Sequence, residues 1–201
     1  MTRILLATNN PGKVREFRRL IEGSGFKAVT PAEAGIVLDV DETGGSYEAN
    51  ALLKATAFAQ AGNGLALADD SGIEVDALSG GPGMYSARYG GPELDDEGRV
   101  TLLLREVAKA PDGERGARYR AVVAVAWPVV GDAIESAVFE GVQEGTLARR
   151  PSGADGFGYD PIFVVAAGRT QAQLSGAEKD AISHRGQAVR KALAFLQARL
   201  A

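Results

Sequence analysis

The sequence predicts an α/β fold, one domain over residues 1–201 built around a mixed β-sheet. Short apolar runs that are typical of strands alternate with segments whose apolar residues recur at helical spacing. Two further apolar runs, residues 119–130 and 133–145, indicate an antiparallel hairpin in the same sheet. Since 45% of the residues are apolar and 24% are charged, the composition is that of a packed globular chain rather than a disordered one.

The first third of the chain predicts two strands and two helices. Val14, Phe17 and Ile21 fall on one helical face, and Ser46 stands where it can cap the second helix. An acidic, glycine-containing loop precedes that helix. The expected elements are a strand over 3–8, a loop over 9–13, a helix over 14–23, a strand over 26–30 and a helix over 47–62.

The rest of the chain predicts further strands and two more helices. Residues 65–78 are interpreted as a strand, a turn at Gly72 and a second strand. Pro128 limits hydrogen bonding at the end of the first hairpin strand. The remaining expected elements are a long loop over 79–93, a helix over 95–109, a hairpin turn at Gly131 and Asp132, a loop over 149–161, a strand over 162–165 and a helix over 184–200 capped by Ser183.

Charge and composition exclude several classes of function. The chain has no cysteine, which rules out disulfides, zinc–thiolate sites and thiol catalysis. A net charge of −4 argues against a general nucleic-acid partner, because binding to a phosphate backbone needs a basic surface. The first apolar run is too short for a signal peptide, and no stretch of about 18 apolar residues follows. We therefore expect a soluble cytoplasmic protein with no membrane partner.

The segment ATNNPGK joins the first strand to the first helix and is a candidate anion site. Backbone amides and a helix N-terminus suit a negative charge, and Lys13 adds a positive one. The pattern is not that of a Walker A loop. An ordinary turn is the competing interpretation, because Asn, Pro and Gly are all turn formers.

The stretch LALADDSGIEVDAL places acidic residues inside an apolar run. Side chains alternate along a strand, so Asp69 and Asp70 cannot both face solvent. Adjacent carboxylates at a strand end are suited to Mg²⁺, which takes one or two protein carboxylates and leaves its other positions to water and phosphates. The alternative is an Asx turn leading into Ser71. Glu74 and Asp76 are expected to face solvent from the second strand.

Three further segments carry candidate site residues. Asn50 and Lys54 are four apart on the helix after the acidic loop and share one face, although a solvated helix face beside an acidic loop is equally consistent. The glycine-rich segment GADGFGYD offers flexible backbone beside aromatic rings, which suits a flat heterocycle, although a glycine-rich turn with its aromatics in the core is equally consistent. Lys179, His184 and Arg185 gather three donors at a helix start, and the alternative for His184 is a surface or capping residue.

Taken together these segments resemble the inosine triphosphate pyrophosphatase family, the non-canonical purine nucleoside triphosphate pyrophosphatases. The matching motifs are TNNPGK, ETGGSYEANALLKA, ADDSGIEVDAL with GGPGMYSARYGG, GFGYDPIF and EKDAISHRG. They run from Thr8 to Gly186 and cover nearly the whole chain. The resemblance implies a long mixed sheet with flanking helices and two lobes around a central cleft, in a homodimeric enzyme.

The implied reaction is the hydrolysis of ITP, dITP and XTP to the nucleoside monophosphate and pyrophosphate with Mg²⁺. Asp70 is implied as general base and metal ligand. The candidate metal ligands are Asp41, Glu42, Asp69 and Asp70. The candidate substrate-binding residues are Thr8, Asn9, Asn10, Pro11, Gly12, Lys13, Asn50, Lys54, Ser71, Phe157, Gly158, Tyr159, Asp160, Lys179, His184 and Arg185.

Two positions depart from the family pattern. Asp41 stands where many relatives carry Glu, so the division of roles between Asp41 and Glu42 stays open. Asp155 adds a carboxylate before GFGYD. Two other functions also stay open, namely a pyrophosphatase with a different base preference and a nucleotide-sensing module that does not hydrolyse its ligand.

Overall fold

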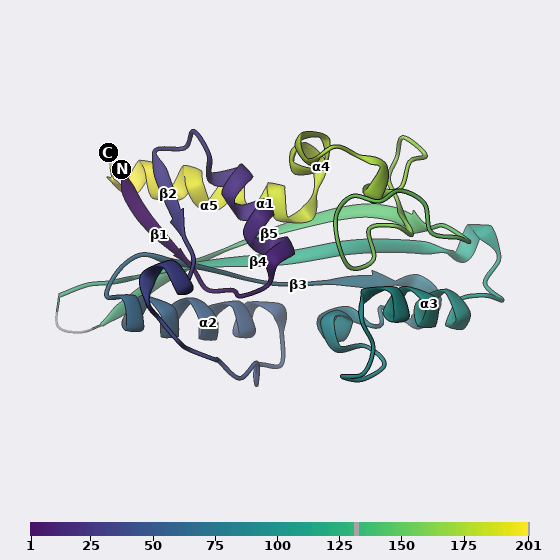
Figure 1. The fold of residues 1–201 in the computed structure, drawn as a ribbon, viewed down its shortest axis with the longest axis horizontal. Coiled ribbons are helices and arrows are strands. Elements are labelled where there is room, and N and C mark those ends of the chain that lie inside the picture. The colour runs from purple at the N-terminus through teal and green to yellow at the C-terminus, as the bar shows by residue number, and fades with distance from the viewer. Residues whose placement is uncertain (131–132, 201) are drawn as a thin grey trace. The chain divides into compact units, whose positions relative to one another are not determined.

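The computed structural model describes residues 1–130 and 133–200 and confirms a mixed α/β fold with helices flanking a sheet (Figure 1). The α-helices are α1 (Pro11–Ile21), α2 (Tyr47–Gly62), α3 (Asp96–Glu106), α4 (Gly176–Ile182) and α5 (His184–Leu200). The strands are β1 (Thr2–Leu6), β2 (Phe26–Val29), β3 (Ala66–Val75), β4 (Gly116–Pro128), β5 (Ile134–Leu147) and β6 (Phe163–Val164).

One six-stranded sheet in the order β2-β1-β3-β4-β5-β6 organises the described chain. β1 pairs in parallel with β2 and with β3, and β5 pairs antiparallel with β6, so the expected mixed sheet is confirmed. β4 and β5 are adjacent, as a hairpin requires. The turn predicted at Gly131 and Asp132 lies outside the described residues.

The chain divides into two compact units, and each is described by itself. The first comprises residues 1–70, 121–141 and 185–201, and the second comprises residues 71–120 and 142–184. A two-part chain is what the resemblance implies, while the central cleft stays a prediction.

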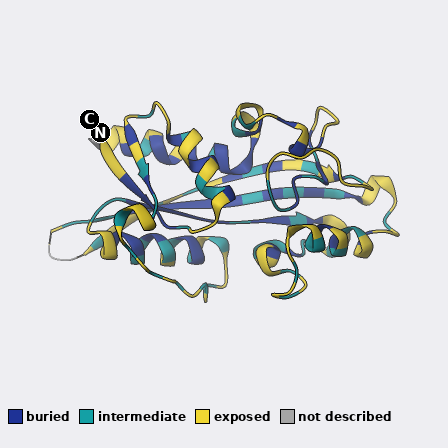
Figure 2. Ribbon diagram, in the orientation of Figure 1, coloured by how far each residue is buried: buried dark blue, intermediate teal, exposed yellow. Residues whose placement is uncertain are grey.

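In the first unit the sheet is covered on both faces (Figure 1). Successive residues of a strand point to opposite faces. Ile4 and Leu6 of β1 therefore join one buried cluster with residues of α1 and α5, whereas Leu5 joins a second cluster with residues of α2. Figure 2 shows the buried strands between helices whose outer faces are exposed. This two-sided burial fixes which face each side chain of β3 can reach.

The second unit has its own core. Leu103 and Val107, at the end of α3 and just after it, pack with Ile73 of β3 and with Tyr119 of β4. The Tyr119 ring lies 4.6 Å from the Phe163 ring between centroids. The core therefore links α3 with β3, β4 and β6.

The predicted turn at Gly72 is wrong, because β3 continues unbroken from Ala66 to Val75. Gly72 is needed for a close approach instead. A Cβ atom there would overlap the carbonyl oxygen of Gly83 and lie 2.7 Å from Ser86 Oγ. Asp69 and Asp70 accordingly lie inside a strand rather than at its end, and Asp76 begins a short 3₁₀ helix rather than lying on a second strand.

Helix boundaries also differ from the prediction in places. α2 has the predicted bounds, and Ser46 caps it by accepting a hydrogen bond from the Ala49 amide. α1 begins at Pro11, inside the predicted loop, because Asn10 caps it and proline suits a first helical position. The loop over 79–93 contains a 3₁₀ helix, Gly83–Arg88, and α4 was not predicted.

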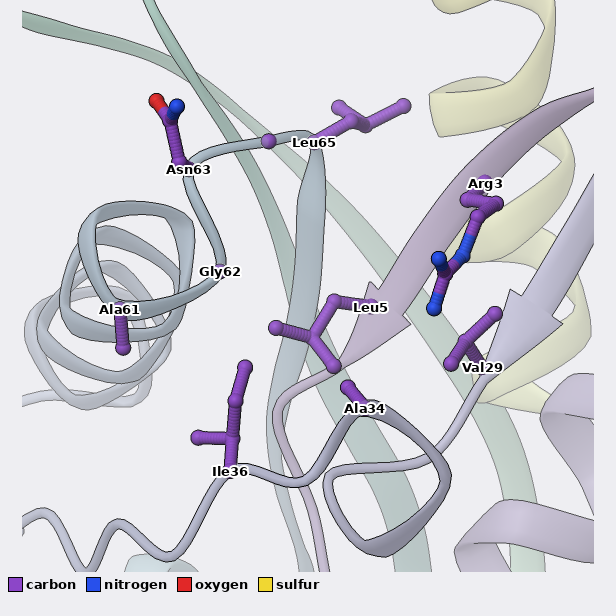
Figure 3. A pocket seen from close by; sticks show the side chains of 10 residues that line it. Arg3, Leu5, Val29, Ala34, Ile36, Ala61, Gly62, Asn63 and Leu65 are labelled. Carbon is purple, nitrogen blue, oxygen red and sulfur yellow. The ribbon is translucent and has the colours of Figure 1, made fainter.

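A cavity of about 390 Å³ opens in the first unit beside Gly62, at the end of α2 (Figure 3). Leu5, Ala34 and Ile36 line it together with Arg3. None of its lining residues is a candidate site residue. No helix among residues 1–130 and 133–200 is long and apolar enough to span a membrane.

We expect Gly72→Ala to lower the free energy of unfolding by about 1–3 kcal/mol, because the added methyl group overpacks the contact between β3 and the Gly83 backbone. Urea denaturation measures this change. Gly113→Ala is the control, since a Cβ at Gly113 meets no atom within 4 Å. Equal stability of the two variants would contradict the close-approach role of Gly72.

Candidate active site

The loop after β1 forms a capped helix start. The Thr8 hydroxyl accepts a hydrogen bond from the Asn10 amide at 3.2 Å, and the Asn10 side chain accepts one from the Lys13 amide at 3.0 Å. Asn9 is exposed, and Pro11 and Gly12 form the first turn of α1. The predicted anion loop therefore presents the N-terminus of an eleven-residue helix.

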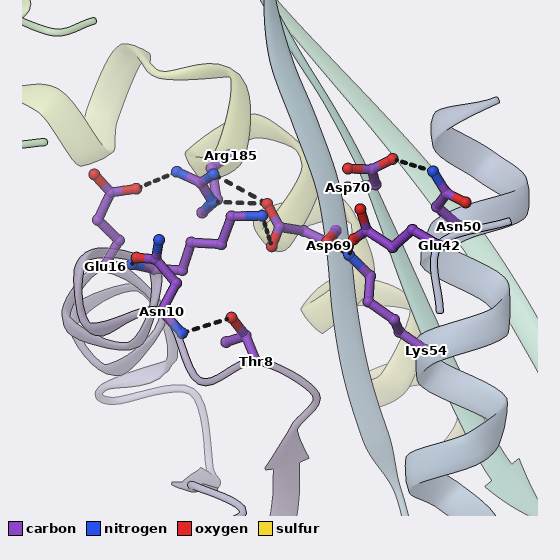
Figure 4. Close-up of polar contacts among 10 residues, drawn as sticks. Thr8, Asn10, Glu16, Glu42, Asn50, Lys54, Asp69, Asp70 and Arg185 are labelled. Carbon is purple, nitrogen blue, oxygen red and sulfur yellow. Dashed lines mark hydrogen bonds and ion pairs between the residues drawn. The ribbon is translucent and has the colours of Figure 1, made fainter. Parts of the chain in front are cut away.

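Lys13 is the outer end of a row of ion-paired charges, whose other members are labelled in Figure 4. Its Nζ lies 3.0 Å from Asp69 Oδ1. Asp69 Oδ2 accepts hydrogen bonds from Arg185 Nη2 at 3.0 Å and Nε at 3.1 Å, and Arg185 Nη1 lies 2.5 Å from Glu16 Oε2. The Lys13 side chain is 18% exposed, whereas the other three are 5% exposed or less. Of these four charged side chains, Lys13 is thus the one that solvent reaches.

These ion pairs decide the ionisation of Asp69. Burial alone raises the pKa of Asp69, but the neighbouring charges of Lys13 and Arg185 outweigh burial and hold that pKa far below its usual range. Burial lowers the pKa of Arg185, and its contacts with Asp69 and Glu16 more than reverse this. Asp69 is therefore a fixed anion at neutral pH and is unsuited to accept a proton.

Asp70 lies on the opposite face of β3 from Asp69 (Figure 4). Its Oδ2 accepts a hydrogen bond from Asn50 Nδ2 at 2.9 Å. Burial raises the pKa of Asp70, and the Asn50 hydrogen bond and the Lys54 charge offset this only in part. The two adjacent aspartates therefore have pKa values shifted in opposite directions, and Asp70 is the better proton acceptor.

The acidic loop and α2 meet at Asp70. Lys54 Nζ lies 2.5 Å from Glu42 Oε1 and donates to the Asp69 carbonyl at 2.7 Å. Asn50 Oδ1 accepts a hydrogen bond from the Gly44 amide at 2.9 Å. Asn50 and Lys54 do share one face of α2, as the sequence predicted. Of the two acidic candidates, Asp41 is exposed and Glu42 is the one turned toward Lys54.

The donors around Asp70 fit a divalent cation. Burial is the main cause that raises the pKa of Asp70, and the negative charge of Glu42 adds to it, so the two carboxylates lie in each other's field (Figure 4). Within residues 1–130 and 133–200, no group of three or more His, Cys, Asp or Glu side chains could hold a metal ion. Two carboxylates are the usual protein share of a Mg²⁺ site that substrate phosphates complete. Asp69 does not fit this set, since its carboxylate binds Lys13 and Arg185 on the other face of β3.

The second unit holds another group of candidate residues. Asp160 and Lys179, both buried, form an ion pair, and Asp160 Oδ2 also accepts a hydrogen bond from the Phe157 amide at 2.9 Å. Lys179 Nζ lies 5.1 Å from the centroid of the Phe157 ring. The Tyr119 hydroxyl donates to Asp160 Oδ1 at 3.3 Å. Asp160 therefore fixes the position of both Lys179 and Phe157.

The remaining candidates have structural partners. The buried His184 ring stacks on the Tyr119 ring, with centroids 4.6 Å apart and planes 9° from parallel. The Tyr159 hydroxyl donates to the Ser86 carbonyl at 2.9 Å, and the Gly158 amide donates to Asp96. Burial raises the pKa of Tyr159. Ser71, the residue after Asp70, is half-buried on β3.

Two residues that organise the candidate site were not predicted. Glu16 lies three residues after Lys13, beside the buried Phe17 on α1. A charged residue in this position was a signal for a buried ionic partner. Tyr119 lies in an apolar strand and gave no signal beyond its aromatic ring.

Comparison with known proteins identifies the family. The model of the Ham1 family matches residues 4–195. The chain belongs to the Ham1 family. A Ham1 protein from Staphylococcus aureus has a structure similar to this one, with a TM-score of 0.84 and 40% identity, covering 98% of this chain and 100% of that chain. A HAM1 protein from Coxiella burnetii gives a TM-score of 0.85 at 39% identity, with the same coverage.

Curated relatives of this Ham1 chain carry the name dITP/XTP pyrophosphatase. The relative from Symbiobacterium thermophilum is 50% identical and covers 98% of this chain and 96% of its own length. The relative from Bacillus subtilis is 43% identical over 98% of both chains. The family resemblance inferred from the sequence is therefore confirmed.

We expect Asp69→Asn to lower the free energy of unfolding at pH 7 by about 3–5 kcal/mol, because it leaves Lys13 and Arg185 without their shared buried anion. The pKa of Asp69 is depressed in the folded state, so its stabilisation is complete above the unfolded pKa of about 3.9 and is lost as pH falls toward the folded value. The stability difference from the wild type should therefore be constant between pH 7 and pH 5 and narrow below about pH 4.

Urea denaturation across this pH range measures the effect. Asp41→Asn, at an exposed aspartate, is the matched control and should change stability little at any pH. A difference in the free energy of unfolding between wild type and Asp69→Asn that widens on acidification would contradict the assigned direction of the pKa shift of Asp69.

Proposed function

We propose that this Ham1 protein hydrolyses the non-canonical purine nucleotides ITP, dITP and XTP to the monophosphate and pyrophosphate. The observation that carries the proposal is the buried Asp70 carboxylate, whose pKa is raised, held by Asn50 beside Lys54 and Glu42. The name of its relatives, dITP/XTP pyrophosphatase, supplies the substrate class. We further propose that both units act together as a single pyrophosphatase domain over residues 1–201.

Triphosphate binding is proposed for the helix start after β1. The amides of Asn9 and Gly12 offer hydrogen-bond donors and the N-terminus of α1 offers a positive dipole end, whereas Pro11 has no amide hydrogen. Lys13, the partly exposed member of its charge chain, and Lys54 add cationic side chains. Asp69 serves in this proposal to hold Lys13 in place rather than to bind metal.

Asp70 is the proposed general base. A water molecule gives its proton to the Asp70 carboxylate while its oxygen forms a bond to the α-phosphorus. The bond from that phosphorus to the bridging oxygen of the β-phosphate breaks, and pyrophosphate leaves. Glu42 and Asp70 would hold the divalent cation, proposed as Mg²⁺, which when bound neutralises charge that develops on the phosphate oxygens.

Base recognition is proposed for the second unit. The half-exposed Phe157 ring is available to stack on a purine, and Asp160 and Lys179 fix its position. A hydrogen-bond donor of the site can pair with the 6-oxo group of the purine. The amino group that adenine carries at that position is itself a donor, so it would leave the donor of the site unpaired. Arg185 was predicted to contact the nucleotide, but its guanidinium binds Asp69 and Glu16, so we assign it to support of Asp69.

Assembly and location are proposed from the family resemblance. We propose a cytoplasmic homodimer, and size-exclusion chromatography with light scattering tests its mass. A monomer at micromolar concentration would remove the dimer from the proposal without touching the chemistry at Asp70.

Asp70→Asn is expected to lower kcat by about 10²–10⁴-fold, since the amide cannot accept the proton of the attacking water. Its free energy of unfolding at pH 7 should not fall, because burial raises the pKa of Asp70 and the ionised group costs the folded state stability. Release of pyrophosphate from ITP and urea denaturation measure the two quantities. Asp39→Asn, at an exposed aspartate, is the control. Full activity of Asp70→Asn would exclude Asp70 as the base.

A substrate panel tests specificity. With Mg²⁺ present, we expect pyrophosphate release from ITP, dITP and XTP with kcat/KM at least about tenfold above that for ATP and GTP. Loss of one interaction of about 1.4 kcal/mol at the 6-oxo group is enough for tenfold against ATP. The expectation for GTP, which keeps a 6-oxo group, rests on the family resemblance. Preferred turnover of modified pyrimidine nucleotides would favour the alternative base preference. Nucleotide that binds and survives incubation with Mg²⁺ would favour the sensing module instead.

A further inference from the structure

Residues 36–43 form a segment without helix or strand between the 3₁₀ helix Ala32–Ala34 and α2, and we refer to it as the strap. Within the described chain, residues 37–40 make no hydrogen bond. Their side chains alternate in burial. Leu38 and Val40 pack against the buried cluster that includes residues of α2, whereas Val37 is fully exposed. Apolar contact is therefore what holds the middle of the strap.

The alternation of the strap determines where its acidic residues point. Side chains two apart in an extended chain lie on the same side. Glu42 follows Val40 by two and is turned inward to Lys54, while Asp41 is exposed. The inward position of Glu42 is thus continuous with the register that Leu38 and Val40 set.

Polar contacts fasten the strap at its two ends. The Ile36 amide donates to the Pro31 carbonyl at 2.9 Å, and the Gly44 amide donates to the Asn50 side chain at 2.9 Å. The Ile36 side chain borders the cavity shown in Figure 3, so its packing is incomplete. Leu38 and Val40 are therefore the packed apolar residues nearest to Glu42 in the sequence.

We propose that Leu38 and Val40 are positioning residues that hold Glu42 beside Asp70 and so set the affinity of the site for a divalent cation. This inference rests on the proposed function for the pairing of Glu42 with Asp70. Loss of the Leu38 or Val40 side chain removes the apolar contact that holds the middle of the strap. The Glu42 carboxylate then spends less time in the position beside Asp70 that a cation needs.

Binding of Mn²⁺ to the purified full chain, followed by the loss of the free Mn²⁺ electron paramagnetic resonance signal, tests the proposal without turnover. We expect Leu38→Ala and Val40→Ala each to raise the Kd for Mn²⁺ at least threefold. Val37→Ala, on the exposed side of the same strap, is the matched control and should bind as the wild type does. Glu42→Gln is the reference for complete loss of the Glu42 ligand.

Hydrogen exchange of the strap amides provides a second readout. Exchange over residues 41–44 should be faster in Val40→Ala than in Val37→Ala, with α2 protected in both. Val40→Thr, which keeps the side-chain shape and reduces its apolar character, should show the same direction and covers the case in which the alanine variant does not fold. Equal Mn²⁺ affinity of Val40→Ala, Val40→Thr and Val37→Ala would overturn the proposal.

The outcome is separable from that of the proposed function. A wild-type protein that binds Mn²⁺ through Glu42 but releases no pyrophosphate from ITP would overturn the proposed reaction and leave the strap inference standing. Wild-type turnover of ITP together with unchanged Mn²⁺ affinity in Leu38→Ala and Val40→Ala would overturn the strap inference alone.

Discussion

The buried contact of Asp69 with Lys13 and Arg185 is the interaction on which the first unit depends. It joins β3 to the start of α1 and to the start of α5, three elements that are far apart in the sequence. A buried charge is costly unless it is paired, so each member needs the others. The same contact that stabilises the fold therefore fixes the position of Lys13 at the mouth of the proposed triphosphate site.

The alternation of side chains along β3 places two aspartates with different proposed roles on opposite faces of the strand. Asp69 and Asp70 are adjacent on β3, yet one faces α1 and α5 and the other faces α2. Cations surround the first and lower its pKa, whereas burial beside Glu42 raises the pKa of the second. Neighbouring carboxylates with opposite shifts can divide structural and acid–base roles without any change of residue type.

Local sequence signals predicted part of the fold and part of the candidate site, but not the contacts between residues that are distant in the sequence. A capping serine and apolar spacing gave the bounds of α2, and the strand alternation required one of the two aspartates to be buried. Gly72 misled because a glycine needed for close packing against Gly83 looks like a turn in sequence. The role of Arg185 was also hidden, since its partner Asp69 is 116 residues away and only tertiary structure brings them together.

The net charge of the side chains around Asp70 explains why the proposed reaction would need a divalent cation. The charged side chains of this group in the first unit comprise three cations, Lys13, Lys54 and Arg185, and four acids, Glu16, Glu42, Asp69 and Asp70. Counted as ionised they sum to one negative charge, which alone would repel a triphosphate. A divalent cation held by Glu42 and Asp70, as proposed, would reverse that sign and would let Asp70 act as a base beside an anionic substrate. Affinity for the cation and affinity for the nucleotide are therefore coupled, so each should strengthen the binding of the other.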